Sequence, residues 1–148
     1  MKRIKKTVRF LSRSTHKLVT QPDEAWLLLR MAWWVVVLSG TARCYSLPRA
    51  LRIVAGNPKR SRAAISRDDL ARAIDLLLSA DFLMFRPVCW KRAAVLHRYL
   101  SRNGEPTRII FGVRNESGEV DGHAWLEADG QPILETTPPN YVVTYSFP

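Results

Sequence analysis

One cysteine and one histidine in this chain have the surroundings of a nucleophile and its base. Cys89 stands at the start of a predicted helix, and His123 lies in a predicted strand 34 residues later. A cysteine attacks as the thiolate, and a histidine can take the thiol proton and later protonate a leaving amine. The pair therefore predicts acyl chemistry on a peptide, with Cys89 as nucleophile and His123 as base.

The two cysteines of the chain differ in their surroundings. Lys91 and Arg92 follow Cys89, and both nearby cations and the amides of a helix start favour a thiolate. Cys44 has no helix start beside it, and we expect it to be inert packing. With two cysteines and no Cys-x-x-Cys pair, the sequence indicates neither a disulfide framework nor a zinc site. We expect no metal and no cofactor.

A third group must fix the tautomer of the base, and the register of the following hairpin selects it. A two-residue loop at Asp129-Gly130 would put Glu135 on the strand face opposite His123. A three-residue loop starting at Ala128 would pair His123 with Glu135 directly. That register collects the apolar residues on one face, and burial of one face specifies register. We therefore predict the three-residue loop, with Glu135 as the orienting acid and Asp129 as the weaker candidate.

The other residues considered for a role in catalysis have weaker support from the sequence. His97 lies about 12 Å from Cys89 along the same helix, at 1.5 Å per residue, which is too far for the base. We expect Trp26, Trp33 and Trp34 to lie in the core, and the Cys89 backbone amide to be one oxyanion donor.

Apolar residues recur at helical spacing before and just after the cysteine, and at strand spacing towards the C-terminus. Helices followed by antiparallel strands define an α+β fold, with the nucleophile helix packed on a small sheet. We expect one domain over residues 1–148, made of a basic arm (1–20), a helical region (21–80) and a catalytic part (81–148). The expected helices span residues 23–38, 46–54, 66–78 and 89–103, and the expected strands span 108–113, 123–127, 132–136 and 141–147.

The charge is strongly positive, at +10, and residues 1–17 hold seven cations without one acid. Nucleic acid, an anionic membrane surface or an acidic partner would each suit it. The apolar stretch 25–40 is short for a membrane span and contains Arg30, so we expect a core helix. We place the protein in the cytoplasm, with peripheral membrane contact left open.

The rival to catalysis from another class is a basic nucleic-acid-binding module. No RNA- or DNA-binding motif is recognisable, and the aromatic residues are not clustered as base stacking needs. We expect no nucleic acid partner. An acyltransferase remains an alternative, because transfer and hydrolysis share the acyl-enzyme and differ only in the acceptor.

Several segments together resemble the transglutaminase-like leader peptidases of lasso peptide biosynthesis, most strongly over residues 82–136. This resemblance implies a transglutaminase-like or papain-like fold and a Cys–His–acid site that removes the leader from a ribosomal precursor peptide. Cys89 and His123 carry over directly, whereas Glu135 stands where the family usually has Asp. The segments are Pro-Val-Cys-Trp at 87–90, Tyr-Leu-Ser-Arg-Asn-Gly at 99–104, Arg-Ile-Ile-Phe-Gly-Val at 108–113 and Gly-His-Ala-Trp-Leu-Glu at 122–127.

The resemblance also implies partners. The chain looks like the split form of the family, which lacks the leader-binding domain of the fused members. It would then depend on a separate leader-recognition protein, and a separate macrolactam cyclase would use the amine that cleavage exposes. We expect the basic arm to serve docking rather than chemistry.

Overall fold

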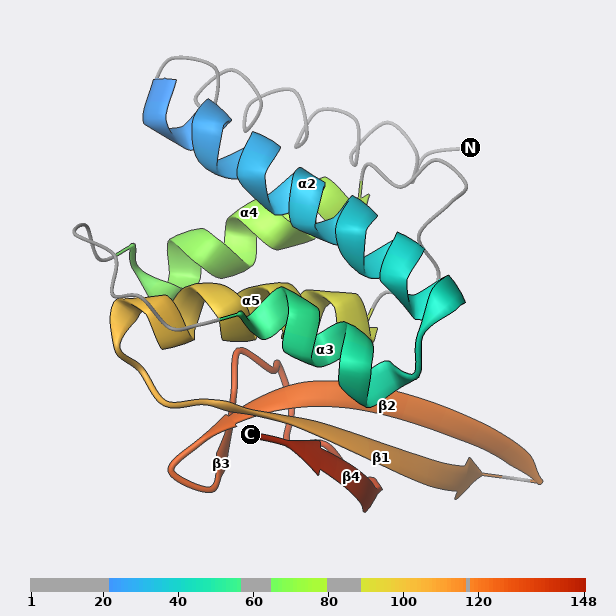
Figure 1. Ribbon diagram of the computed structural model, residues 1–148. Coiled ribbons are helices and arrows are strands. Elements are labelled where there is room, and N and C mark those ends of the chain that lie inside the picture. Colours follow the sequence, from blue (N-terminus) through green and yellow to red (C-terminus); the bar gives the residue numbers. More distant parts are fainter. Residues whose placement is uncertain (1–21, 57–64, 80–88, 117) are drawn as a thin grey trace, which may run out of the picture.

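The computed structural model describes residues 22–56, 65–79, 89–116 and 118–148 (Figure 1). Within these ranges, the chain forms helices first and strands last, which confirms the predicted α+β class. The basic arm lies outside the described residues. The elements are α2 (Pro22–Cys44), α3 (Leu47–Ala55), α4 (Arg67–Ser79), α5 (Cys89–Asn103), β1 (Arg108–Glu116), β2 (Glu119–Ala128), β3 (Gln131–Ile133) and β4 (Val142–Phe147).

The helices lie on one side of the sheet, and α5 is the central element (Figure 1). It contacts α2, α3 and α4 as well as β1 and β2. Eight of its fifteen residues are buried, and they include Lys91 and His97 as well as apolar residues. Burial on so many sides fixes the position of α5, and thereby the position of Cys89 at its start.

Short sequence signals set the ends of α3 and α4. Ser66 caps α4: its Oγ accepts the Asp69 amide at 3.1 Å and donates to the Asp69 carboxylate at 2.7 Å. Pro48 occupies the first turn of α3, where no amide partner is needed. At the other end of α3, Arg98 of α5 donates to the carbonyl groups of Val54 and Ala55 and so joins the two helices.

Helix α2 runs four residues beyond Gly40, where the sequence predicted its end. One face packs into the core through Met31, Val35 and Leu38. Trp26 and Trp33, on the other face, are more than 60% exposed, so the prediction that they lie in the core is wrong. A glycine alone did not stop this helix: of the four helical residues after it, two are half-buried and two are exposed, and Thr41 donates to the carbonyls of Val37 and Leu38 across Gly40.

The segment Ala25–Cys44 of α2 is long and apolar enough to cross a membrane, by length and composition only. The core helix of a soluble protein and a signal sequence have the same properties.

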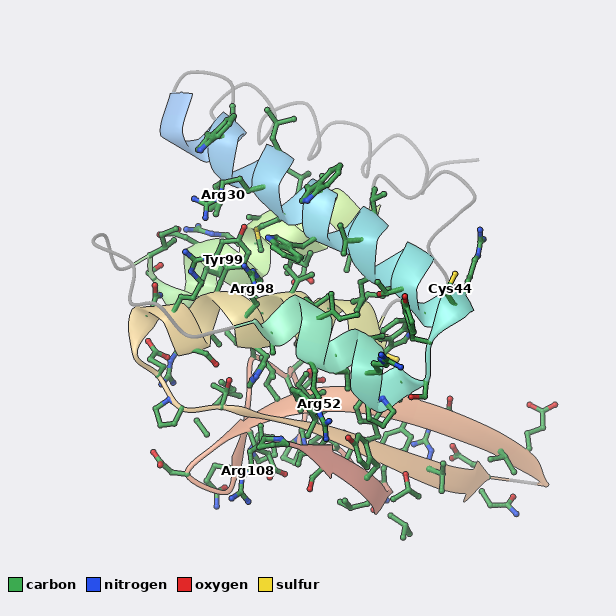
Figure 2. The ribbon with its side chains drawn as sticks, viewed as in Figure 1. Arg30, Cys44, Arg52, Arg98, Tyr99 and Arg108 are labelled. Carbon is green, nitrogen blue, oxygen red and sulfur yellow. The ribbon has the colours of Figure 1, made fainter. Side chains whose placement is uncertain are left out.

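Figure 2 shows Arg98 and Tyr99 between α5 and α2, and Cys44 at the end of α2. There the guanidinium of Arg98 lies 3.7 Å from the ring centre of Trp34. The half-buried Trp34 is thus the one of the three predicted core tryptophans that packs against a neighbouring helix.

The four strands form one antiparallel sheet in the order β3-β2-β1-β4. β1 and β2 pair along their whole length, with Gly112 opposite His123. The pairing of β1 with β4 shifts register between Phe111 and Gly112, where β4 carries one extra residue. This long central hairpin places His123 near the middle of β2, the strand that packs against α5.

The loop between β2 and β3 differs from the prediction. Ala128 pairs with Gln131, so Asp129 and Gly130 form a two-residue turn, and both have positive φ, 51° and 76°. Two such residues make the type I′ turn, whose twist matches that of the flanking strands. Asp-Gly is a strong signal for this turn. The three-residue register is therefore wrong, and β3 ends after Ile133.

Candidate active site

Cys89 is the first residue of α5 and is half-buried. The first turn of α5 contains no acidic residue, so no carboxylate there opposes a thiolate. The amides of this first turn point towards the N-terminal end of the helix and favour an anion there. Cys44 is exposed rather than packed, which corrects the expectation for it.

Glu135 contacts the imidazole of His123. Nε2 of the imidazole lies 3.2 Å from Oε2 of Glu135, and the two side chains are 29% and 17% exposed. An ionised carboxylate can only accept, so His123 donates through Nε2–H and Nδ1 is left as the basic nitrogen. The second acid candidate, Asp129, lies exposed in the turn.

Leu134 explains how Glu135 reaches His123 although the register does not pair them. Leu134 has φ of 59°, a left-handed conformation that is uncommon for a residue with a side chain. Leu134 interrupts the alternation of side chains along the strand. Glu135 therefore points in a different direction from the one it would take if β3 continued. A backbone of this kind costs about 1–3 kcal/mol and often accompanies functional sites.

Arg92 holds the other oxygen of Glu135. Its Nη1 lies 3.4 Å from Oε1 of Glu135, while Nε and Nη2 bind the two oxygens of Asp75 on α4 at 2.6 and 3.2 Å. Burial opposes the charge of Arg92, but the contacts with Asp75 and Glu135 outweigh it and raise the pKa of the guanidinium. Arg92 therefore stays charged and couples Glu135 to α4.

An aromatic group surrounds the imidazole. The ring centres of Tyr141 and Trp125 lie 5.3 and 6.1 Å from that of His123. Tyr141 donates to Asp121 at 2.7 Å, and this bond, with a smaller contribution from nearby Cys89, raises the pKa of the phenol. Tyr141 is thus a protonated side chain that is held in place beside His123.

Gly112 makes room for this aromatic group. A Cβ on Gly112 would lie 2.7 Å from Cβ of Tyr141 and 3.0 Å from the Trp125 ring, closer than real contacts allow. Only glycine at this position lets both rings pack beside His123.

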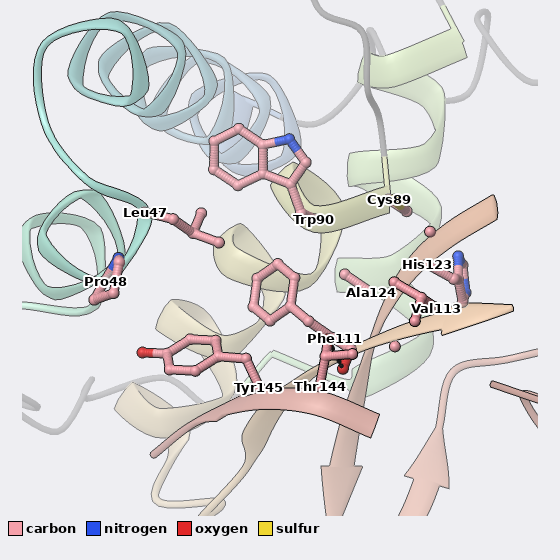
Figure 3. A pocket seen from close by; sticks show the side chains of 12 residues that line it. Leu47, Pro48, Cys89, Trp90, Phe111, Val113, His123, Ala124, Thr144 and Tyr145 are labelled. Carbon is pink, nitrogen blue, oxygen red and sulfur yellow. Dashed lines mark hydrogen bonds between the residues drawn. The ribbon is translucent and has the colours of Figure 1, made fainter. Parts of the chain in front are cut away.

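Cys89 and His123 line one cavity of about 490 Å³. In Figure 3 the two residues lie at one end of it, and Leu47 and Pro48 lie at the other. Trp90 and Phe111 lie between these ends. The cavity therefore gives a substrate access to both catalytic candidates at once.

Sequence reasoning singled out Cys89, His123 and Glu135, and the structure brings the last two into contact and the first two to one cavity. It missed the roles of Arg92 and Tyr141. Arg92 was noted only as a cation near the thiol, because a link to Glu135 across 43 residues has no local signal. His97 faces the core instead, with Nδ1 2.9 Å from Thr107 Oγ1.

The described residues contain no group of three histidines, cysteines or acids placed to hold a metal ion. What they do contain is a thiol at a helix start, an imidazole oriented by a carboxylate, and a cavity that joins them. This arrangement suits nucleophilic attack on a carbonyl carbon and defines a class, the enzymes with a Cys–His–acid site on an α+β fold.

Comparison with known proteins agrees with that class. A family model of the transglutaminase-like superfamily matches residues 32–146, and the chain belongs to this family. Its members are typically cysteine-dependent enzymes of the protease or acyltransferase kind. Neither the curated proteins nor the solved structures contain a match to the chain.

Proposed function

We propose that this protein is a cysteine peptidase that removes the leader from a ribosomally made lasso precursor peptide. The observation that carries the catalytic part is the His123–Glu135 contact of 3.2 Å at the end of a cavity that Cys89 also lines. The substrate class rests on the resemblance of residues 82–136 to the lasso leader peptidases and on membership in the transglutaminase-like superfamily.

The reaction runs in two halves. Nδ1 of His123 takes the thiol proton, and the sulfur of Cys89 attacks the scissile carbonyl carbon. The tetrahedral intermediate collapses, the C–N bond breaks, and the imidazolium gives its proton to the leaving amine. A thioester to Cys89 remains. His123 then takes a proton from water, whose oxygen attacks the thioester, and the proton returns to the departing sulfur. The products are a free carboxylate and a free amine.

Glu135 stabilises the imidazolium of His123 in both halves of the reaction. Its carboxylate compensates the positive charge that forms on His123, and its bond to Nε2 leaves Nδ1 as the nitrogen that takes the thiol proton. Arg92 prevents Glu135 from turning away, because it binds the oxygen that does not face the imidazole.

The partners belong to the same proposal. A separate leader-recognition protein delivers the precursor, and a macrolactam cyclase consumes the exposed amine. Tethered delivery raises the effective substrate concentration to about the millimolar range without new contacts at the active site. Cleavage by the peptidase alone should therefore be slow at low precursor concentration and faster with the recognition protein. Equal rates would contradict this dependence.

The test is cleavage of a lasso precursor followed by mass spectrometry in ¹⁸O-labelled water. We expect a leader with one ¹⁸O at its new carboxylate, and no product from Cys89→Ala or His123→Ala with unchanged circular dichroism. An acyltransferase would instead join the leader to an added amine without ¹⁸O. Full cleavage by either variant would overturn the catalytic assignment.

A further inference from the structure

We propose that the cavity beside Cys89 is a subsite for a bulky, uncharged apolar side chain of the substrate, next to the bond that is cleaved. This inference rests on the proposed peptidase function and adds a requirement on the substrate. It does not follow from the Cys–His–acid site, which would serve any peptide bond.

The lining of the cavity carries the inference. Apart from Cys89 and His123, it is made mostly of aromatic and aliphatic side chains, and among the described residues that line it none is an Asp, Glu, Lys or Arg. Ligand sites in proteins commonly enclose about 300–1,000 Å³, so a cavity of about 490 Å³ has room for a large side chain and adjoining backbone. A charged side chain would lose hydration there and find no partner of opposite charge.

The geometry places the bound side chain next to the scissile bond. A carbonyl carbon at the sulfur of Cys89 lies at one end of the cavity, and Leu47 lies at the other end (Figure 3). A substrate side chain that extends from this end passes Trp90 and Phe111. Because Cys89 lines the cavity itself, the occupant is a near neighbour of the cleaved bond.

Leu47 offers a substitution that changes the charge of the cavity and spares the fold. It is 36% exposed and is the first residue of α3. The first turn of α3 holds no acidic residue, and a carboxylate at a helix start is favourable. Leu47→Glu therefore puts a negative charge at the far end of the cavity, and Leu47→Gln is its neutral control of the same size.

Alkylation of Cys89 tests the subsite without any peptide. The reagents are iodoacetamide, its N-benzyl derivative and the N-[4-(aminomethyl)benzyl] derivative, which has a similar shape and a positive charge. In each reaction the sulfur of Cys89 bonds to the CH₂ carbon and iodide leaves. Cys44→Ser serves as the background protein, because Cys44 is exposed and would also react. Rates at Cys89 are measured by mass spectrometry and divided by the rates with free glutathione.

We expect the benzyl reagent to gain about 10- to 200-fold over iodoacetamide, the range by which apolar pockets discriminate small differences in side chains. The cationic reagent should gain little. Leu47→Glu should raise the relative rate of the cationic reagent and lower that of the benzyl reagent, whereas Leu47→Gln should lower the benzyl rate alone. The subsite would be overturned if Cys89 showed the same selectivity among the three reagents as free glutathione. Identical behaviour of the Glu and Gln variants would also overturn it.

This test separates the subsite from the peptidase. Selective alkylation without cleavage of any precursor would keep the subsite and reject the proposed function. Precursor cleavage together with unselective alkylation would keep the peptidase and reject the subsite.

Discussion

Nε2 of His123 lies 3.2 Å from Oε2 of Glu135, although the hairpin register does not pair the two residues. The contact depends on the left-handed backbone of Leu134, which ends the strand pattern one residue before the acid. A longer side chain also helps, since Glu reaches the imidazole from a position outside the regular strand. A Glu at position 135 thereby has a local structural reason.

Glu135→Gln should reduce kcat/KM less than His123→Ala does. A general base contributes about 10²–10⁴-fold, and His123→Ala removes it altogether. The amide of Gln keeps the length of the side chain and an oxygen that can accept from Nε2–H, but it does not compensate the imidazolium charge. Cleavage kinetics of both variants check this order. A Gln variant as inactive as His123→Ala would show that Glu135 does more than orient the base.

Arg92→Gln should lower kcat and move the acidic limb of the pH–rate profile to higher pH, because His123 must be neutral to act as the base. The substitution removes a positive charge on the far side of Glu135 and leaves more of its negative charge to favour the imidazolium. Arg92→Lys should restore the pH profile in part, because it keeps the charge without the two-pronged bond to Asp75. Profiles of kcat and kcat/KM over pH give the readout.

Arg72→Gln is the matched control for Arg92. Arg72 is on α4, its side chain is 78% exposed, and its partner is Asp69 rather than Glu135. Exposed ion pairs contribute about 0–1 kcal/mol to stability. We expect an unchanged pH profile in this variant. A loss of activity in Arg92→Gln without any change in its pH profile would indicate packing alone.

The sequence predicted the class of the fold and most elements because these depend on local signals. The capping pattern at Ser66 and the strand alternation after Pro106 each act within a few residues, and the structure has α4 and β1 where they indicate. Gly40 misled the prediction, since a glycine within a helical pattern is a weak stop signal and α2 continues to Cys44. The exposure of Trp26 and Trp33 likewise depends on where neighbouring helices lie.

The candidate site was predicted in part for the same reason. Cys89 and His123 stand out through their neighbours in the chain. Glu135 was selected through a register that the structure does not have, because facial alternation cannot foresee a left-handed Leu134. The link from Arg92 to Glu135 and the contact between the rings of Tyr141 and His123 join distant parts of the chain, and only the folded arrangement reveals them.

Leu134→Ile should lower activity because β-branched residues avoid positive φ. The substitution keeps the volume of the side chain but favours an extended backbone, which would turn Glu135 away from His123. Leu126→Ile is the control, since Leu126 is buried in β2 and an extended backbone suits Ile there. Both variants should lose at most about 1.5 kcal/mol from repacking. Equal activities of the two would contradict the role of the Leu134 backbone.

Gly112→Ala should destabilise the protein and reduce kcat/KM. The added methyl group would meet Tyr141 and Trp125 at 3.0 Å or less, so the aromatic group beside His123 must shift. Gly40→Ala is the opposite case, because its Cβ would meet nothing within 4 Å in the helical α2. That variant should gain about 0.5–1 kcal/mol in stability. Thermal unfolding and cleavage kinetics of both proteins test the contrast.

Folding stability should fall with decreasing pH through His97, independently of the active site. Burial lowers the pKa of His97 below 6.5, with a smaller opposing effect from its hydrogen bond to Thr107, so the folded protein favours the neutral ring. Below about pH 6.5 the unfolded chain binds the proton more readily, and the free energy of unfolding drops as pH falls. Above that pH both states hold a neutral ring and the contribution is constant. For one group the slope cannot exceed about 1.4 kcal/mol per pH unit.

His97→Gln removes the titrating ring and keeps a partner for Thr107. Urea unfolding from about pH 5 to pH 8 should therefore show a smaller loss of unfolding free energy at low pH in the variant than in the natural protein. Parallel stability curves would contradict this assignment, and kcat/KM should stay nearly the same, since His97 does not line the cavity that holds Cys89.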